Sequence, residues 1–388
     1  SREAFGRTTL EPPVGSGPYV VAAVDPGRVL TLRRNPDHWA RDLNVTRGRF
    51  NFDEIRFDYY RDANTLFEAF TAGNIDLRME EDPGRWAQAY RFPAVTSGQV
   101  IAREFETGLP AGMSALVFNT RKSPFDDRRV RRALMLAFDF SWLNRNLYHS
   151  LYTRTQSLFE RSYLASTGRP ADATERALLA PFPSAVGDDV MAGRFRVPDS
   201  TDGNNRQNLR LAADLLREAG YELTDGVLVH GRTRQPLRFE FLGQQTRAQE
   251  RLMLAYKESL QQLGIAMSVR TVDSSQYWAR IKTFDFDMLQ MLWRSSLSPG
   301  NEQFNRWGSG AADTQGSLNL AGVRSAAADA MIEAMLKAET QAEFVSATRA
   351  LDRVIMSGDY MIPLFHVRGQ WVAYWRRITP PPRTPLSG

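Results

Sequence analysis

The chain of 388 residues contains no cysteine, which excludes disulfides, thiolate nucleophiles and zinc sites built on cysteine. No apolar run approaches the roughly 20 residues that a helix needs to cross a bilayer, so the sequence predicts no membrane-spanning helix. A secretory signal is also absent, but the sequence opens at Ser1 and not at a methionine. Processing or truncation can remove such a signal, so its absence here decides nothing about export.

Histidine is scarce, and the usual signatures of enzymes are missing. The four histidines show no ligand spacing such as His-Glu-x-x-His, and we interpret them as isolated surface or packing residues: His38, His149, His230 and His366. Gly15–Gly17 lacks the third glycine of a dinucleotide site, and neither a nucleophile elbow nor a P-loop occurs. The sequence predicts a protein without cofactor or metal that is not an enzyme. A hydrolase that uses the acidic residues Glu80–Asp82 is the rival reading.

Charge of one sign is not concentrated along the chain. Its 49 basic and 44 acidic residues are interspersed and leave a formal charge of +5, which does not predict a nucleic-acid surface. The largest basic cluster lies on one expected helix and comprises Arg128, Arg129, Arg131 and Arg132. We interpret this cluster as a solvated helix face, with a phosphate site as the alternative.

What the chain does contain is an alternation of strands and helices, in at least two units given its length. Alternating apolar residues predict strands at 30–32 and 55–59. Asn64 is the expected N-cap of the helix that follows, and Gly73 is expected to end it. The first third of the chain therefore predicts strands that lead into a helix.

The later part of the chain predicts a mixed sheet. In order we expect a strand over 116–118, a helix capped by Asp126 or Asp127, a long surface excursion over 166–208, a helix capped by Asn208, a hairpin turn at Asp225-Gly226 and strands over 237–241, 265–272 and 286–293. We also expect a helix that a capping box of Thr246 and Gln249 opens and that stops at Gly264, and helices over 328–338 and 342–356. A disordered linker is the alternative for the excursion. The strand, helix, strand order over 237–272 predicts a βαβ crossover.

Aromatic residues lie near polar loops, which is typical of a ligand site with an apolar wall and a few oriented polar groups. The clearest case is Trp293–Gln303, where an apolar strand ends and the sequence turns polar at once. Ligands of open α/β sheets bind at the carboxyl ends of strands, so we predict binding there, with an ordinary strand exit as the alternative. A second candidate is Tyr148–Glu160, which includes Tyr152 and Arg154, with a packed aromatic turn as its alternative.

Two separated motifs resemble those of a known family. Residues 12–19 read PPVGSGPY and residues 116–139 read LVFNTRKSPFDDRRVRRALMLAFD. Both are similar to signatures of the family 5 extracellular solute-binding proteins, which include dipeptide, oligopeptide and nickel binders. The resemblance is strongest to the Yej-type subgroup, linked to uptake of oligopeptides and of the antibiotic microcin C. It is carried by the stretches YTRTQSLFERSYLASTG, RTVDSSQYWARI, FDFDM, SLSPGNEQ and ALDRVIMSGDYMIPLFH.

The resemblance implies an α/β fold of the periplasmic-binding-protein type II (class C), with mixed sheets and two lobes that close on a ligand like a Venus flytrap. Lobe I would comprise residues 1–121, with 363–388 returning to it, and lobe II would comprise residues 122–362. In this family the first motif usually lies well inside the chain. We therefore expect an incomplete first lobe, unless a separate N-terminal fragment supplies the rest.

The resemblance also implies a function. The protein would be a periplasmic subunit of an ABC importer that captures an oligopeptide or a peptide-like conjugate and delivers it to permease subunits in the inner membrane. A binder of another solute, such as a sugar, an opine or a metal chelate, is the alternative on the same fold. The expected ligand contacts are Asn119 near the hinge, Tyr152, Arg154, Trp293, Arg294, Ser296, Asn301 and Glu302.

Ser296 departs from the pattern of the oligopeptide binders, which carry an aspartate at this distance after the tryptophan. In those proteins the aspartate pairs with the amino terminus of the peptide. Without a carboxylate here, a charge-assisted hydrogen bond to an ammonium group is lost. We expect amino-terminally blocked or unusual peptides as ligands, unless Glu302 or an upstream residue replaces the aspartate.

Overall fold

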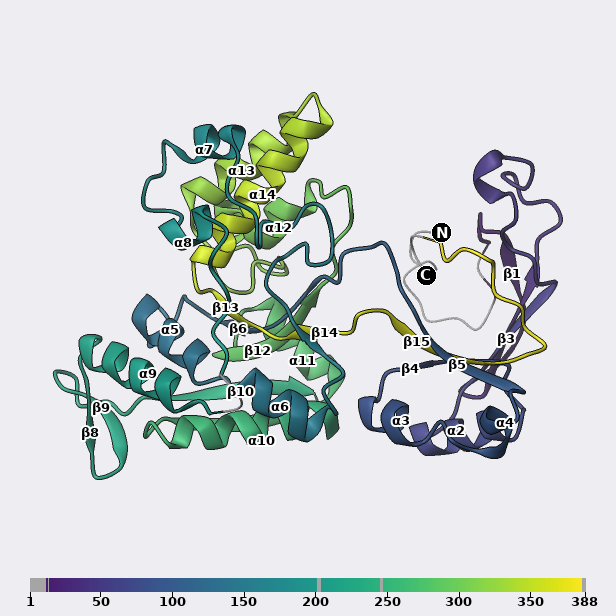
Figure 1. Cartoon of the computed structure of the whole chain (residues 1–388), viewed down its shortest axis with the longest axis horizontal. Coiled ribbons are helices and arrows are strands. Elements are labelled where there is room, and N and C mark those ends of the chain that lie inside the picture. The colour runs from purple at the N-terminus through teal and green to yellow at the C-terminus, as the bar shows by residue number, and fades with distance from the viewer. Residues whose placement is uncertain (1–11, 13, 201–203, 245–246, 386–388) are drawn as a thin grey trace. The chain divides into compact units, whose positions relative to one another are not determined.

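The computed structural model describes residues 12, 14–200, 204–244 and 247–385, so Pro13 of the first motif and Thr246 of the predicted capping box lie outside the described residues. The chain divides into two compact units, whose elements are labelled in Figure 1. Unit 1 comprises Ser1–Arg78, Arg91–Ala102 and Ala373–Thr379, and unit 2 comprises Met79–Tyr90, Arg103–Val372 and Pro380–Gly388. These bounds differ from those of the predicted lobes, and the assignment of residues to lobes remains a prediction.

Unit 1 contains an antiparallel sheet with the strand order β1-β2-β3. Its strands are β1 (Tyr19–Asp25), β2 (Val29–Arg34) and β3 (Glu54–Asp58), and a 3-10 helix, η1 (Asn44–Thr46), lies between β2 and β3 in the sequence. The two strands predicted at 30–32 and 55–59 are therefore confirmed, although the second ends at Asp58.

Helix α2 (Ala63–Thr71) begins earlier than predicted. Its N-cap is Asp62 and not Asn64, because the Asp62 carboxylate accepts hydrogen bonds from the backbone N–H groups of Asn64 and Thr65. Gly73 follows the helix with a φ of +79°, as its predicted role requires. A Cβ at Gly73 would lie 3.4 Å from the Trp375 ring, so the glycine also brings the chain close to that indole.

A second sheet has the order β4-β15-β5, and the division between the units falls within each of its strands. The strands are β4 (Leu77–Glu80), β5 (Val100–Phe105) and β15 (Gln370–Trp375), and the short helices α3 (Pro83–Gln88) and α4 (Pro93–Thr96) lie between β4 and β5 in the sequence. The chain enters unit 2 at Arg103 and leaves it after Val372. We call the segment that follows Arg103, up to Gly112, the first chain crossing, and the segment that leads to Val372 the second chain crossing.

Unit 2 is built on a mixed sheet with the strand order β11-β10-β12-β6-β13. Its strands are β6 (Met113–Phe118), β10 (Arg238–Gln244), β11 (Ala266–Val272), β12 (Met288–Trp293) and β13 (Met361–Pro363). Strand β10 runs parallel to β11 and β12, whereas β6 runs antiparallel to β12 and β13. The apolar residues of β6 are buried, because helices cover both faces of the sheet. The mixed sheet and the four predicted strands that form it are confirmed.

Helices pack around this sheet (Figure 1). They are α5 (Arg128–Leu136), α6 (Phe140–Leu147), α9 (Arg206–Glu218), α10 (Arg247–Gln261), α11 (Ser274–Lys282), α12 (Glu302–Trp307), η2 (Ser309–Ala311), α13 (Ala326–Lys337) and α14 (Gln341–Ser357). Helix α10 joins the parallel strands β10 and β11, which confirms the predicted crossover. Asp127 caps α5, one of the two predicted possibilities, but Asn208 is no cap because α9 already begins at Arg206.

Two local predictions concern the segments on either side of α9. Strands β8 (Tyr221–Thr224) and β9 (Val227–His230) form the expected hairpin, and both turn residues, Asp225 and Gly226, have positive φ. The described part of the excursion, residues 166–200 and 204–208, contains α7 (Ala173–Leu179) and α8 (Asp188–Met191) and is folded onto unit 2 rather than being a linker.

A buried ion pair anchors this excursion to α14. Arg353 Nε donates to Glu175 Oε2 at 2.6 Å, and each of the two side chains is at most 1% exposed. Arg353 Nη2 also donates to the carbonyl oxygen of Arg169 at 2.7 Å. Because charge is costly to bury without partners, this pair specifies where the excursion packs.

The arginine cluster on α5 is not simply a solvated face, which corrects the prediction. Arg131 is buried and donates to the backbone carbonyls of Asp359, Phe125 and Gly358. Arg128 and Arg132 both pair with the buried carboxylate of Asp359. The helix period places Arg128, Arg131 and Arg132 on one side of α5, where they hold the end of α14 and the start of β13.

Replacement of Arg353 by methionine should lower the free energy of unfolding by about 3–5 kcal/mol, since Glu175 would keep a buried, unpaired charge. The matched control is Arg194→Met, which breaks the exposed pair with Asp189 and should change stability by less than about 0.5 kcal/mol. Urea unfolding followed by circular dichroism measures both. Equal effects of the two substitutions would contradict an anchoring role for Arg353.

Candidate functional site

The two candidate segments of the sequence lie side by side in unit 2. Ser295 Oγ donates to the carbonyl oxygen of Leu158 at 2.7 Å, and Tyr163 Oη donates to the carbonyl oxygen of Leu297 at 3.3 Å. Both contacts lie beyond the carboxyl end of β12, the edge at which the sequence predicts binding. We call the loop residues 294–302, most of which are at least partly exposed, and the adjacent turn 156–163 the rim.

Gly112 brings the first chain crossing against the rim. It has a φ of +75°, and a Cβ at this position would lie 2.6 Å from the carbonyl oxygen of Trp293. Any other residue would therefore displace the backbone where β12 ends. The Ala111 N–H donates to the carbonyl oxygen of Glu160 at 2.9 Å, so the same crossing also holds the turn.

The turn is anchored from below by Asp352 of α14, which is completely buried. The Asp352 carboxylate accepts hydrogen bonds from Ser157 Oγ, Leu158 N and both Ser166 N and Ser166 Oγ, at 2.6–2.9 Å. Burial raises the pKa of Asp352, and these four donors oppose that rise. The turn therefore has a fixed conformation before any ligand arrives.

Four predicted contact residues are exposed on the rim loop: Arg294, Ser296, Asn301 and Glu302. The Glu302 carboxylate accepts hydrogen bonds from Gly300 N and Gln303 Nε2, each at 3.0 Å. Partial burial acts to raise the pKa of Glu302, but these hydrogen bonds outweigh it and the pKa is lowered. Glu302 thus also fixes the start of α12.

Three other predicted contacts are buried inside unit 2: Asn119, Arg154 and Trp293. Trp293 is 2% exposed and packs against Trp307 with ring centroids 4.9 Å apart. Arg154 is 6% exposed, lies 4.7 Å from the Phe138 ring, and has its pKa lowered to about 10 by burial. The sequence suggests that side chains at the end of a strand are exposed to solvent. In the structure, residues of α6 and α12 pack over Arg154 and Trp293 and bury them.

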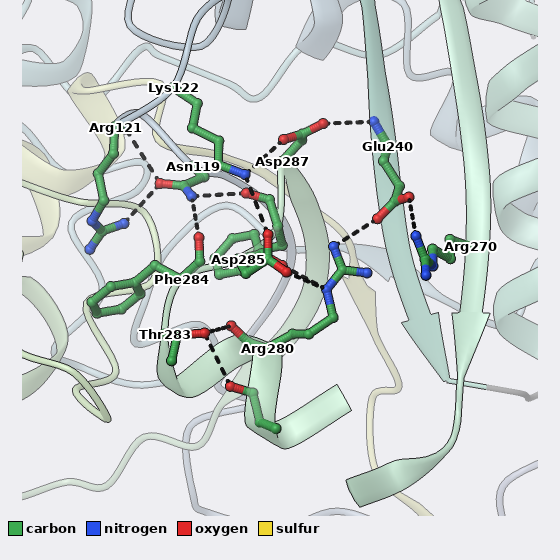
Figure 2. Close-up of polar contacts among 12 residues, drawn as sticks. Asn119, Arg121, Lys122, Glu240, Arg270, Arg280, Thr283, Phe284, Asp285 and Asp287 are labelled. Atoms are coloured by element: carbon green, nitrogen blue, oxygen red, sulfur yellow. Dashed lines mark hydrogen bonds and ion pairs between the residues drawn. The ribbon is translucent and has the colours of Figure 1, made fainter. Parts of the chain in front are cut away.

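Asn119 is the third buried residue, and its role is structural (Figure 2). Its Nδ2 donates to the carbonyl oxygens of Phe284 and Phe286 at 3.0 and 2.9 Å, and its Oδ1 accepts from Arg121 Nη1 at 3.0 Å. The Arg121 guanidinium lies over the Phe284 ring at 3.9 Å. Asn119 therefore ties the end of β6 to the segment that precedes β12, away from the rim.

An aromatic cluster that the sequence analysis missed surrounds Tyr152, which is partly exposed. The Tyr152 ring centroid lies 5.9 Å from that of Trp371, and Trp371 stacks on Trp86 at 5.7 Å with the rings 7° from parallel. Burial, with Asp82 and Glu81 nearby, raises the pKa of Tyr152 to about 12. Only the aromatic composition of the sequence pointed to such a cluster, because Trp86, Tyr152 and Trp371 lie too far apart in the sequence to form a recognisable pattern.

Two acidic residues of the rival hydrolase reading, Glu80 and Asp82, have structural partners. Glu80 accepts hydrogen bonds from Tyr90 Oη at 2.9 Å and from Arg85 Nη1 at 3.3 Å, and Asp82 caps α3. In the part of the chain that the structure describes, no group of three His, Asp or Glu side chains could hold a metal ion. The described helices also include none with the length and apolarity to cross a membrane.

The second chain crossing is held to the turn by Arg161 and Thr155. Arg161 Nη2 donates to the carbonyl oxygen of Thr107 at 3.1 Å and Nη1 to that of Val367 at 3.5 Å, so one guanidinium contacts both crossings. His366 Nδ1 lies 3.0 Å from Thr155 Oγ1. Burial and the positive charge of Arg161 lower the pKa of His366 to about 4.

Substitution of Asn119 by alanine should lower the free energy of unfolding by about 2–4 kcal/mol, since two buried carbonyls and Arg121 lose a partner. Asn301→Ala on the exposed loop should change it by less than about 0.5 kcal/mol. Urea unfolding of the two variants tests the structural assignment, which an unaltered stability of Asn119→Ala would contradict.

His366 should make stability fall in acid. Its folded-state pKa of about 4 lies below its ordinary value of 6.5, so the unfolded chain takes up a proton first as the pH drops. Stability is complete above pH 6.5 and declines down to about pH 4, by about 2–3 kcal/mol relative to His366→Gln. Urea unfolding of both proteins between pH 7 and 4 measures this difference. Parallel pH curves would show that His366 is not the cause.

Comparison with known proteins identifies the family. The model of the bacterial extracellular solute-binding proteins, family 5 Middle, matches residues 1–315. A binding protein of Brucella melitensis is 53% identical over 392 residues, which cover 100% of this chain and 63% of the relative. The peptidoglycan-binding protein YepA of Agrobacterium fabrum is 44% identical, over 100% of this chain and 64% of YepA. The probable peptide-binding protein YejA of the same organism is 41% identical, over 99% of this chain and 63% of YejA. The chain thus spans less than two thirds of these relatives.

Solved structures share the fold. The oligopeptide-binding protein AppA of Bacillus subtilis, in complex with a nonapeptide, matches with a TM-score of 0.69 and 19% identity, over 94% of this chain and 63% of AppA. NikZ of Campylobacter jejuni, in complex with Ni(L-His), matches with a TM-score of 0.70 and 16% identity over the same shares. These matches confirm the predicted mixed α/β fold of the type II periplasmic binding proteins, and the resemblance to Yej-type proteins is confirmed by the relatives. The chain therefore belongs to family 5 of the bacterial extracellular solute-binding proteins.

Proposed function

We propose that the protein is the periplasmic solute-binding subunit of an ABC importer, which captures oligopeptides or peptide-like conjugates and delivers them to the permease. The observation that carries this proposal is the identity of more than 40% to YepA and YejA across nearly the whole chain. Their names describe binding of peptidoglycan and of peptides. A conjugate such as microcin C would fall within the same ligand class.

The rim supports this ligand class. A site that binds a peptide backbone needs hydrogen-bond donors and acceptors together with apolar walls. In such a site a few polar groups of the protein orient the ligand. Arg294, Ser296 and Asn301 supply exposed polar groups, and Tyr152 supplies an aromatic face. We propose these residues and Glu302 as the ligand contacts. Asn119, Arg154 and Trp293 would support them from inside.

The lobe assignment is also a proposal. Residues 1–121 and 363–388 would belong to lobe I and residues 122–362 to lobe II, with the ligand enclosed by closure of the lobes. A separate N-terminal fragment would complete lobe I. Unit 1 supports this, because β1, β2 and β3 contain no buried residue and expose Val24 and Phe57.

A non-peptide ligand is the second candidate, because structures with this fold hold other solutes. NikZ is in complex with Ni(L-His), and NikA of Brucella suis is in complex with Fe(III)-EDTA. Catalysis is not part of the proposal. The family consists of solute-binding proteins, and Glu80 and Asp82 serve structural roles in this chain.

A thermal-shift screen tests the ligand class. Mixed random tetrapeptides at 100 times their dissociation constant should stabilise the protein by about 2.7 kcal/mol, because they bind only the folded state. Sugars and metal chelates at the same concentrations serve as the comparison. A shift with chelates or sugars and none with peptides would contradict the peptide assignment.

A further inference from the structure

A cavity of about 690 Å³ opens beside the arginine cluster of α5, and the proposed function makes no use of it. Its lining residues belong to α5, α8 and the residues that follow it, α9 and the end of α14, whose helices are labelled in Figure 1. Four arginines line it: Arg128, Arg129, Arg132 and Arg194. A phosphate site is the alternative that the sequence leaves open for the three on α5.

The cavity lies at the opposite end of the sheet from the rim. Trp293, after which the rim loop begins, pairs with Met113 at the start of β6. Met361, two residues after the cavity residue Asp359, pairs with Val117 near the end of β6. Most of the length of β6 separates the two places, so a small ligand in the cavity would not contact the rim.

The positive charge of the cluster is only partly balanced. Arg128 Nε and Arg132 Nη1 contact the two carboxylate oxygens of Asp359, at 2.8 and 3.2 Å, so two guanidinium groups share one carboxylate. The other two arginines of the lining each pair with an aspartate of their own. Within the described part of the chain, Arg128 and Arg132 together thus keep an excess of one positive charge over their shared partner.

Arg132 also offers hydrogen-bond donors that the protein does not use. Its Nε and Nη2, which lie on one edge of the guanidinium plane, contact no acceptor among the described residues. The side chain is 31% exposed, and neither nitrogen is among the buried atoms that lack a partner, so a ligand in the cavity can reach this edge. Arg128 adds Nη1, since its Nε and Nη2 donate to Asp359 and to the carbonyl oxygen of Ser357. Three nitrogens of two adjacent guanidinium groups are therefore available.

The rest of the wall combines a buried hydroxyl with apolar side chains. Ser357 is 6% exposed, and its hydroxyl has no hydrogen-bond partner among the residues that the structure describes. Val190, Leu215 and Phe195 line the cavity as well, and Cζ of Arg132 lies 5.4 Å from the centre of the Phe195 ring. A cavity of this size, with apolar walls and a few polar groups, suits a small organic ligand better than a bare ion.

We propose that this cavity binds a phosphate monoester that carries an apolar body. Such a group presents three terminal oxygens and a charge of about −1.5 to −2 at pH 7, which complements the three free nitrogens and the excess charge of Arg128 and Arg132. A carboxylate has only two oxygens for these donors. The apolar body would contact Phe195 and the aliphatic side chains beside it. The proposal is independent of the peptide-binding function, because the cavity and the rim share no residue.

The competing explanation is that the arginines only hold the end of α14. Arg132→Gln separates the two roles, because Asp359 keeps Arg128 as its ion-pair partner while the free edge is lost. Asp188→Asn is the complementary variant, since Asp188 lines the cavity and its negative charge opposes an anion there. The matched control is Arg210→Gln, which removes an exposed arginine of α9 outside the cavity lining.

The experiment titrates the full protein with phenyl phosphate and with inorganic phosphate by isothermal titration calorimetry. The native protein should bind one phenyl phosphate per chain, and more tightly than inorganic phosphate, because the ring buries apolar surface. Arg132→Gln should weaken phenyl phosphate binding about 10- to 100-fold, and Asp188→Asn should strengthen it about two- to fivefold. Arg210→Gln should bind like the native protein. A gain of affinity in Asp188→Asn cannot result from misfolding.

Vesicles that contain phosphatidic acid distinguish a lipid headgroup from a soluble ester, with phosphatidylcholine vesicles as the blank. Binding of these vesicles by the native protein and not by Arg132→Gln would assign the cavity to lipid headgroups. Saturable binding of phenyl phosphate without vesicle binding would assign it to soluble esters. The proposal is overturned if the native protein binds neither probe, or if Arg132→Gln and Arg210→Gln bind equally well.

Discussion

The candidate site depends on the hydrogen bonds that the completely buried carboxylate of Asp352 accepts. A buried carboxylate is costly unless donors surround it, and here four donors from Ser157, Leu158 and Ser166 do so. In return, a segment with little regular secondary structure acquires one conformation. The positions of Glu160, Arg161 and the contacts to both chain crossings follow from this anchor.

Buried and partly buried guanidinium groups likewise hold loops in place through unit 2. Arg121 donates to the carbonyl oxygens of Ala312, Asn319 and Leu320, and Arg131 and Arg353 likewise bind backbone carbonyls far away in the sequence. A planar guanidinium with five N–H donors can join several loops at once, which lysine cannot do. In a chain without cysteine, these contacts fix irregular segments that disulfides hold in other proteins.

Much of the fold could be predicted from the sequence, because the pattern that specifies each element is local. Apolar runs indicated β6 and β12, and Asp225-Gly226 marked the hairpin between β8 and β9. The error at Asn64 arose because Asp62 is an equally good cap and only the backbone conformation decides between them. Side-chain burial was harder to predict. Asn119 and Trp293 follow strand patterns that suggest an exposed edge, yet segments more than 100 residues away cover Asn119.

The site shows the same limit. Sequence reasoning found both segments of the rim, because polar residues follow an apolar strand in one and aromatic residues gather in the other. It could not show that Ser295 contacts Leu158, nor that Trp86 stacks on Trp371, since each pair joins segments whose spacing in the sequence carries no information.

The residues that hold the backbone of the rim differ from the rim residues that are exposed. Gly112, Asp352 and Trp293 tolerate little change, because close backbone contact, buried charge or buried aromatic surface depends on each of them. Arg294, Ser296 and Asn301 lie exposed on the loop and have few such duties. Mutations can therefore accumulate at the exposed positions at small cost in stability, and solute-binding proteins of this family could change ligand by exchanging a few side chains on an unaltered scaffold.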